Sequence, residues 1–280
     1  IMNKNPKVSV VIPVYRGKDY FEEALDSVLG QTYQNIEIVV VNDGCNYDEF
    51  YRKIINKKNN KNIIYVYNKE NEGVSSGLNL GIEKTTGDYI AWLSHDDIFH
   101  KEKIEAQVKS LEKNPNYISA TNHRIFYDNS NFKLLYNNTD LNNYDSQILW
   151  LIQNDCLNGC SLLIPKKFIL QQRGFAKELK YTQDYDMWFK LIENHRFLVL
   201  DKYYLLSRRH TQQDSIIKKS QSFNEKLFFY KKVILKVYNL KLISNNDSNL
   251  KKIFASFISR GQIKLGFFFL RIFTQNLIKK

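Results

Sequence analysis

The feature that most constrains the fold is a regular alternation of short apolar runs with longer amphipathic stretches over the first hundred residues. Four runs rich in β-branched residues are typical of strands buried on both faces. Between these runs, apolar residues recur at the three- and four-residue spacing of a helix. Strands and helices alternating at this pitch form βαβ units, which predicts an α/β fold with a mostly parallel, Rossmann-like central sheet. The predicted strands span residues 7–14, 36–41, 63–67 and 89–93, and the predicted helices 21–29, 47–55 and 74–84.

The pattern is less regular beyond the fourth strand. A surface helix is predicted over 101–113, whereas 116–145 is rich in Asn and Tyr and is left unassigned. The later predictions are strands at 161–164, 197–200 and 203–207, a helix at 184–194, and amphipathic helices near 219–239, 248–258 and 261–278.

The charge is distributed very unevenly. Residues 216–280 carry 14 Lys and Arg against 2 Asp and Glu, whereas residues 1–215 carry 27 of each class, so the tail holds the whole net charge of +12. Two features argue against a nucleic-acid partner. The body is neutral, and the basic tail has long apolar faces and no recognisable module that reads a nucleic-acid groove. We therefore expect a body at 1–215, divided into halves at 1–98 and 99–215, and a basic amphipathic helical tail at 216–280.

The cysteine content and the hydropathy indicate a cytoplasmic setting. The chain has three cysteines and no C-x-x-C pair, which favours neither a zinc site nor a disulfide framework. Its first residues are polar, unlike a signal peptide, and no apolar run approaches the roughly 18–20 residues that a membrane-spanning helix needs.

Compact polar or aromatic groups follow each of the four predicted strands. In an open α/β sheet, ligands bind beyond the carboxyl ends of the strands, so these groups are expected to converge on one site. They are Tyr15 after the first strand, Asn42-Asp43-Gly44 after the second, Asn71-Glu72-Gly73 after the third and Ser94-His95-Asp96-Asp97 after the fourth.

Each of these groups has two interpretations. Asp96 and Asp97 are hard oxygen ligands suited to Mg²⁺ or Mn²⁺ on a diphosphate, yet either could instead cap the helix that begins near Lys101. Asp43 could bind a nucleobase or belong to a plain turn with Gly44. Tyr15 could stack on a base or be a surface aromatic residue.

A second group of polar residues lies in the later half. Asp184 could deprotonate an acceptor hydroxyl, or it could serve as a helix cap; it is a better base candidate than Asp186, which lies inside the helix pattern. The cations of Arg208, Arg209 and His210 could stabilise a pyrophosphate leaving group, and His210 could bind a metal. The alternative is a solvated basic strand end.

The order of these segments resembles the inverting family 2 glycosyltransferases, which have the GT-A nucleotide-diphospho-sugar transferase fold. The N-terminal segments that carry the resemblance are VSVVIPVY, QTYQNIEIVVVNDG, NEGVSSGLNLGI and GDYIAWLSHDD. LNGCSLLIPK, TQDYDMWFKL and RRHTQQDS are similar to acceptor-side motifs of the same family. The resemblance covers about residues 7–215.

The resemblance implies a site for a nucleotide sugar and a role for each matching residue. Pro13, Val14 and Tyr15 would line the base pocket, Asp43 would bond the base, usually uracil, and Asn71, Gly73 and Asn79 would lie along the nucleotide. Asp96 would face the ribose or the metal, Asp97 would be the main ligand of Mn²⁺ or Mg²⁺, and His210 would approach the diphosphate or the metal. Asp184 matches the catalytic base of an in-line displacement with inversion.

Three positions depart from the family pattern. Ser94 replaces the first Asp of the metal motif, and Leu78 replaces an Arg found in many relatives. Gln183 replaces the acidic residue that usually precedes the base, so the pKa of Asp184 is expected to be less raised.

The predicted function is transfer of a hexosyl or N-acetylhexosaminyl group from a nucleoside-diphosphate sugar to a saccharide or lipid-linked saccharide acceptor. The resemblance to the family implies that the donor is a UDP-sugar. Surface polysaccharide, lipopolysaccharide or capsule synthesis is the expected setting. Two alternative functions are considered. A sugar-nucleotide pyrophosphorylase is disfavoured because the loop at residues 15–18 is too short and too poor in Gly to hold a triphosphate. The other alternative is a non-catalytic scaffold protein with the same fold. The tail could pack on the catalytic domain, or dock on an anionic membrane surface as a peripheral protein of the inner face, or do both.

Overall fold

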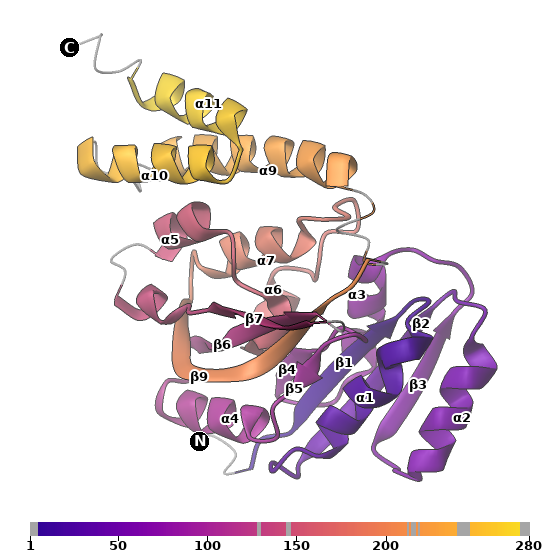
Figure 1. The fold of residues 1–280 in the computed structure, drawn as a ribbon. Coiled ribbons are helices and arrows are strands. Elements are labelled where there is room, and N and C mark those ends of the chain that lie inside the picture. Colours follow the sequence, from indigo (N-terminus) through magenta and orange to yellow (C-terminus); the bar gives the residue numbers. More distant parts are fainter. Residues whose placement is uncertain are drawn as a thin grey trace.

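The protein is described by a computed structural model that covers residues 5–127, 130–143, 147–211, 213, 217, 219–239 and 247–274. Its centre is a nine-stranded sheet (Figure 1). The strands are β1 (Val8–Val14), β2 (Ile36–Asp43), β3 (Ile63–Asn68), β4 (Tyr89–Trp92), β5 (Ile98–Phe99), β6 (Tyr117–Tyr127), β7 (Ser130–Tyr136), β8 (Leu163–Pro165) and β9 (Arg196–Arg209).

Most strands of this sheet run in the same direction, although some neighbouring pairs are antiparallel. The order is β3-β2-β1-β4-β8-β6-β9-β5, and β7 pairs with β6. Strands β1 to β4 are mutually parallel, β8 is antiparallel to both of its neighbours, and β6 and β9 are parallel to each other. As a result, β1, β2, β3, β4, β6 and β9 all present their carboxyl ends at the same edge of the sheet.

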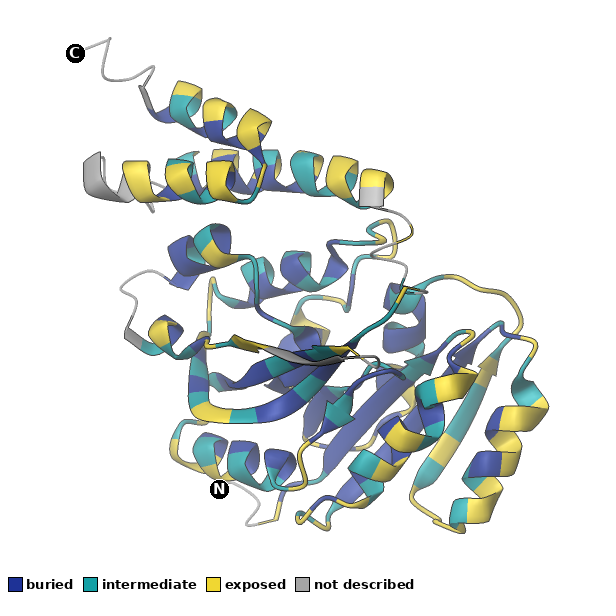
Figure 2. Cartoon of the chain, viewed as in Figure 1, coloured by how far each residue is buried: buried dark blue, intermediate teal, exposed yellow. Residues whose placement is uncertain are grey.

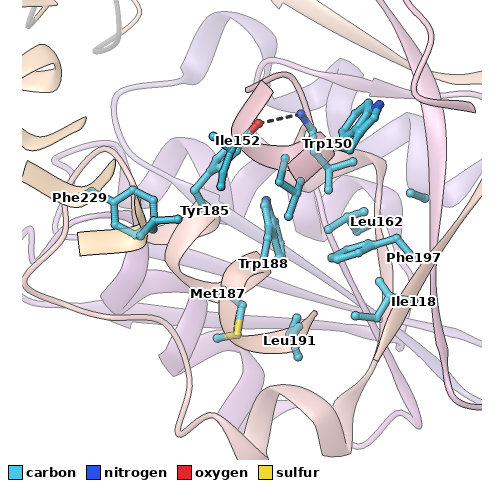
Figure 3. Packing of buried hydrophobic residues seen from close by; sticks show 14 of the residues in the cluster. Ile118, Trp150, Ile152, Leu162, Tyr185, Met187, Trp188, Leu191, Phe197 and Phe229 are labelled. Atoms are coloured by element: carbon cyan, nitrogen blue, oxygen red, sulfur yellow. Dashed lines mark hydrogen bonds between the residues drawn. The ribbon is translucent and has the colours of Figure 1, made fainter. Parts of the chain in front are cut away.

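Helices cover both faces of the sheet, and each face has its own apolar core. Helices α1 (Lys18–Leu29), α2 (Asp48–Lys58) and α4 (Lys103–Lys113) pack on one face. Helices α3 (Val74–Lys84), α5 (Gln147–Asn154), α6 (Lys166–Gln171) and α7 (Gln183–Leu191) pack on the other. Figure 3 shows the centre of the second core, where Trp188 of α7 lies among side chains from α5 and the sheet.

The basic tail forms a third layer of helices, outside the two that cover the sheet. Its helices are α9 (Lys219–Asn239), α10 (Asp247–Ser259) and α11 (Ile263–Thr274), which lie above α5 and α7 in Figure 1. The apolar sides of these helices belong to the same core cluster as α5 and α7, and their outer sides are exposed in Figure 2. Packing of the tail against the body is thus confirmed. Within the described residues, no helix combines the length and the apolar character needed to cross a membrane.

The predicted strands and helices of the first hundred residues are confirmed, whereas the later half needs corrections. The unassigned stretch 116–145 holds β6, β7 and a short 3-10 helix at Thr139–Asn143, and α5 follows at Gln147. The two strands predicted at 197–207 are one strand, β9, because the exposed pair Asp201 and Lys202 forms a bulge opposite β6. Residues 275–278 of the last predicted helix lie outside the described residues.

Candidate active site

The turn after β1 is built against the turn after β4. Gly17 lies directly under the ring of His95, because a Cβ at residue 17 would come within 1.8 Å of the ring carbon Cδ2. His95 in turn donates to the backbone carbonyl of Pro13, and burial lowers the pKa of His95. Tyr15 is partly exposed beside these residues, and the Arg16 guanidinium lies over its ring at 5.1 Å.

The turn after β2 is fixed by Asp43, which is almost fully buried. Its Oδ2 accepts the Gly73 backbone N–H at 2.8 Å, and its Oδ1 accepts the Glu72 N–H at 3.2 Å and the Asn68 amide at 3.1 Å. This carboxylate therefore holds the loop after β3 against the end of β2. The Asn71 side chain also accepts the Gly73 N–H, at 2.9 Å.

Two other residues predicted for the nucleotide site have side chains engaged elsewhere. Val14 is 1% exposed and belongs to the core on the α1 side. The Asn79 amide donates to the Phe175 carbonyl and accepts the Phe175 N–H, both at 2.8 Å. Asn79 thus joins α3 to the loop before α7, and its contact with a nucleotide stays a prediction. Pro13 is partly exposed and lies on the α3 side, near Gly77.

Asp96 and Asp97 lie in the turn after β4, and both are buried. Asp97 accepts the Arg208 backbone N–H at 2.9 Å and a hydrogen bond from the Ser207 hydroxyl. Burial, together with the neighbouring charge of Asp96, raises the pKa of Asp97 to about 7. Neither carboxylate caps α4, whose first turn follows Glu102, so the helix-cap alternative is wrong.

The carboxyl end of β9 closes over these two acids. His210 Nε2 lies 3.2 Å from Asp96 Oδ2, to which Gln213 also donates at 2.8 Å. Arg208 is 6% exposed; its Nε donates to the Asp96 carbonyl, and its guanidinium pairs with Glu23. The alternative of a solvated basic strand end is therefore wrong for Arg208, which braces the turn of the two acids.

The donor set of this cluster fits a hard divalent cation. Asp96 and Asp97 offer adjacent carboxylates, and a cation would offset both the repulsion and the burial that raise the pKa of Asp97. His210 Nδ1 is buried without a hydrogen-bond partner. Among the described side chains, no three or more His, Cys, Asp or Glu residues form a metal-binding group, so further ligands would come from a diphosphate or water.

Asp184 occupies the first turn of α7 and is partly buried. Its Oδ1 accepts the N–H of Tyr185 at 2.8 Å. Burial raises the pKa of Asp184 to about 6, the Tyr185 N–H and Lys226 oppose that shift, and Asp155 adds to it. The pKa is thus raised mainly by burial although Gln183 is neutral, and Asp155 contributes a nearby carboxylate from another part of the chain. Asp186, the weaker candidate, pairs with Lys190.

One segment connects the paired acids to Asp184. The Asn158 amide donates to Ser207 Oγ at 3.4 Å, and the Leu157 N–H donates to the Tyr185 hydroxyl at 3.0 Å. The sequence interpretation missed Asn158, Ser207 and Asp155 as parts of the site, because single polar residues give no periodic signal, whether they lie in a loop or within a strand as Ser207 does.

The sheet order and the acidic cluster at the carboxyl ends of its strands define the class: this is a nucleotide-diphospho-sugar transferase fold of GT-A type. The family model described as Glycosyl transferase family 2 matches residues 9–172, more than half of the chain. The chain belongs to glycosyltransferase family 2.

Similar chains occur in several Rickettsia species. An uncharacterized glycosyltransferase of Rickettsia felis is 40% identical over 226 residues, which cover 79% of this chain and 36% of that protein. Another of Rickettsia typhi is 36% identical over 219 residues, covering 75% of this chain and 66% of that protein. The chain thus spans about a third of the length of the first of these relatives.

Solved structures share the fold at low sequence identity. TarS of S. aureus (residues 1–349, with UDP) superposes with a TM-score of 0.64 at 17% identity, over 83% of this chain and 66% of that one. The mannosyltransferase PcManGT from Pyrobaculum calidifontis, with GDP-Man and Mn²⁺, has a TM-score of 0.63 at 12% identity, over 99% and 88% of the two chains.

Proposed function

We propose that this chain transfers a hexosyl or N-acetylhexosaminyl group from a nucleoside-diphosphate sugar to a hydroxyl group of a saccharide or lipid-linked saccharide, with inversion. The observation that carries the proposal is the presence of two acidic sites of different chemistry, joined by residues 157–158. One is a pair of adjacent carboxylates suited to a cation, and the other is a single carboxylate with a pKa of about 6. Surface polysaccharide, lipopolysaccharide or capsule synthesis remains the proposed setting.

Asp184 is the proposed catalytic base. A carboxylate whose pKa lies near the working pH is mostly ionised, yet it is basic enough to accept the proton of an attacking hydroxyl. Its place in the first turn of α7 stabilises the ionised form through the Tyr185 N–H. The hydroxyl oxygen bonds to the anomeric carbon as the bond to the diphosphate breaks, and Asp184 takes the hydroxyl proton.

Asp96 and Asp97 are the proposed residues for Mn²⁺ or Mg²⁺, with His210 beside them. The cation, when bound, would neutralise charge on the departing diphosphate. Solved fold relatives that carry UDP, UDP-GlcNAc or GDP-Man support a nucleotide-sugar donor. Asp43, Asn71 and Gly73 are proposed for the nucleoside end, with Tyr15 and Pro13 beside them, and we favour UDP.

The tail is proposed to bring the enzyme to an anionic membrane surface, as a cytoplasmic protein on the inner face. Its exposed apolar side chains occur on all three helices, with exposed lysines among them, as on helices that lie in the headgroup region. They are Phe223, Phe228 and Leu235 on α9, Ile258 on α10, and Ile263 and Phe267 on α11.

The test is donor binding and turnover across a panel of nucleotide sugars, with and without Mn²⁺, for wild type, Asp97→Ala and Asp184→Ala. We expect one donor to bind, Asp97→Ala to abolish its metal-dependent binding, and Asp184→Ala to bind normally but lower turnover by at least about a hundredfold.

Asp186→Ala is the matched control, because Asp186 lies two residues further along the same helix and pairs with Lys190. It should bind and turn over like wild type. If no nucleotide sugar binds with any metal, the proposed function is wrong.

A further inference from the structure

The only glutamate of the tail is used to hold the loop in front of α7. Glu225 of α9 directs its carboxylate at three consecutive residues, and it accepts four hydrogen bonds from them. Its Oε2 accepts the Lys180 N–H at 2.9 Å, and its Oε1 accepts the Tyr181 N–H at 2.7 Å and the Thr182 N–H at 2.8 Å. The Thr182 hydroxyl also donates to Oε1, at 2.9 Å.

These bonds fix the start of the helix that carries Asp184. Thr182 is the N-cap of α7, but its side chain makes no capping bond to its own helix. The hydroxyl and the N–H of Thr182 are both committed to Glu225, and Thr182 is 1% exposed. The orientation of α7 at its first turn, and with it that of Asp184 two residues later, therefore depends on a residue of the tail.

The residues around Glu225 on α9 also reach the surroundings of Asp184. Asp155, which follows α5, accepts the Tyr230 hydroxyl at 2.8 Å and the Lys226 ammonium at 3.1 Å. Arg260, after α10, lies 3.7 Å from the same carboxylate. The charged and titratable groups facing Asp184 are thus Lys226 and Tyr230 from α9, Asp155 beside α5, and Tyr185 from α7 itself.

We propose that Glu225 is a positioning residue for the catalytic base, so that helix α9 of the tail completes the active site instead of merely covering the domain. This inference rests on the proposed role of Asp184. Replacement of Glu225 by Gln removes the negative charge and puts an NH2 group in place of one acceptor oxygen, so at least one backbone N–H of residues 180–182 loses its acceptor and faces another donor. Water can replace the lost acceptor only if the loop moves outward, and this movement displaces the first turn of α7.

The experiment compares wild type, Glu225→Gln and a control, Lys236→Met, in the full chain. Lys236 pairs with Glu193, just beyond the far end of α7, so the control removes a bond between tail and body without touching residues 180–182. Three measurements are made: amide hydrogen exchange, the pKa of Asp184 from carboxyl ¹³C NMR, and kcat and donor KM against pH.

For Glu225→Gln, we expect exchange at residues 180–182 to rise about tenfold and kcat to fall about tenfold, with donor KM within about twofold of wild type. The pKa of Asp184 should fall, because a displaced first turn of α7 exposes the carboxyl group and so favours its ionised form. Lys236→Met should resemble wild type in all three. If Glu225→Gln does not fold, Thr182→Val removes one of the four bonds and no charge, and it should show the same changes at smaller size.

Two outcomes overturn the inference. Unchanged exchange at residues 180–182 would mean that Glu225 does not hold the loop. Faster exchange with unchanged kcat and unchanged Asp184 pKa would mean that Glu225 only attaches the tail. If wild type transfers no sugar, the proposed function fails, and exchange and NMR still decide whether Glu225 positions Asp184.

Discussion

At the residue scale, the environment of Asp184, the proposed base, predicts a pH dependence of turnover. Burial raises the pKa of Asp184 to about 6, and a base must be ionised to accept a proton. We therefore expect kcat to rise with pH through about 6 and to level off above about 7. Steady-state rates from about pH 5 to pH 8 measure this. A profile that stays flat across pH 6, with chemistry rate-limiting, would contradict the role of Asp184.

The same raised pKa predicts a gain in stability when the charge is removed. The pKa of Asp184 lies above its ordinary value of 3.8, so the folded state loses stability as pH rises from about 4 to about 6. Asp184→Asn is expected to unfold at higher denaturant concentration at pH 7.5, with a gain on the order of 1–3 kcal/mol that vanishes below about pH 4. The control Asp186→Asn should lose a few tenths of a kcal/mol with its Lys190 ion pair, and an equal loss in both variants would refute the prediction.

At the element scale, the joint between α3 and the loop before α7 depends on Asn79. Removing its amide leaves the N–H and the carbonyl of Phe175 unpaired, and Gly174, at φ +82°, lies against the same amide. Asn79→Ala should lower the free energy of unfolding by about 1–3 kcal/mol while the donor Kd changes by less than about threefold. Chemical denaturation and calorimetric titration with the donor test this, and lost donor binding at unchanged stability would instead support a direct nucleotide contact.

The elements that could be predicted from sequence are those whose burial is visible in the pattern of their own residues. Strands β1 and β2 are rich in Val and Ile because both faces of the sheet are covered by helices there. Strand β6 was not predicted, because the buried polar residues Asn122 and His123 interrupt its apolar pattern. The Asn122 amide accepts the Asn138 N–H at 2.6 Å, a pairing that only the tertiary structure reveals.

The same limit applies to the site. Asp43, Asp96, Asp97 and Asp184 could be singled out because each stands at a strand end or a helix start. Glu225 could not, because its partners lie more than forty residues earlier in the chain and no spacing connects them. The only sequence feature that distinguishes Glu225 is that it is the single glutamate of a basic tail.

At the scale of the whole molecule, the predicted boundary at residue 215 separates a neutral body from a basic tail, but the apolar core continues across it. Tyr230 of α9 is buried in one cluster with Tyr185 of α7, and the two rings lie 6.4 Å apart. Phe257 of α10 and Phe269 of α11 are fully buried in the same cluster. The tail is therefore continuous with the core that supports Asp184, and the outer surface of its described helices is exposed.

That outer surface predicts binding to anionic membranes. Phe267 of α11 is 61% exposed and Phe228 of α9 is 59% exposed, with the Lys232 ammonium 4.3 Å from the Phe228 ring. Basic residues near an anionic surface contribute about 1 kcal/mol each, and a Phe side chain buried among lipids about 1.5–3 kcal/mol. The protein should sediment with vesicles of phosphatidylcholine and phosphatidylglycerol, less so at high salt, and not with phosphatidylcholine alone.

Phe267→Ser should weaken this binding about tenfold or more, because the lost lipid burial corresponds to at least one power of ten in affinity. Leu170→Ser is the matched control, since Leu170 is 57% exposed on α6 of the body, outside the tail. It should sediment like wild type. Equal sedimentation with charged and neutral vesicles, or equal weakening by both substitutions, would show that the tail has no specific membrane surface, and its positive charge would then need another anionic partner.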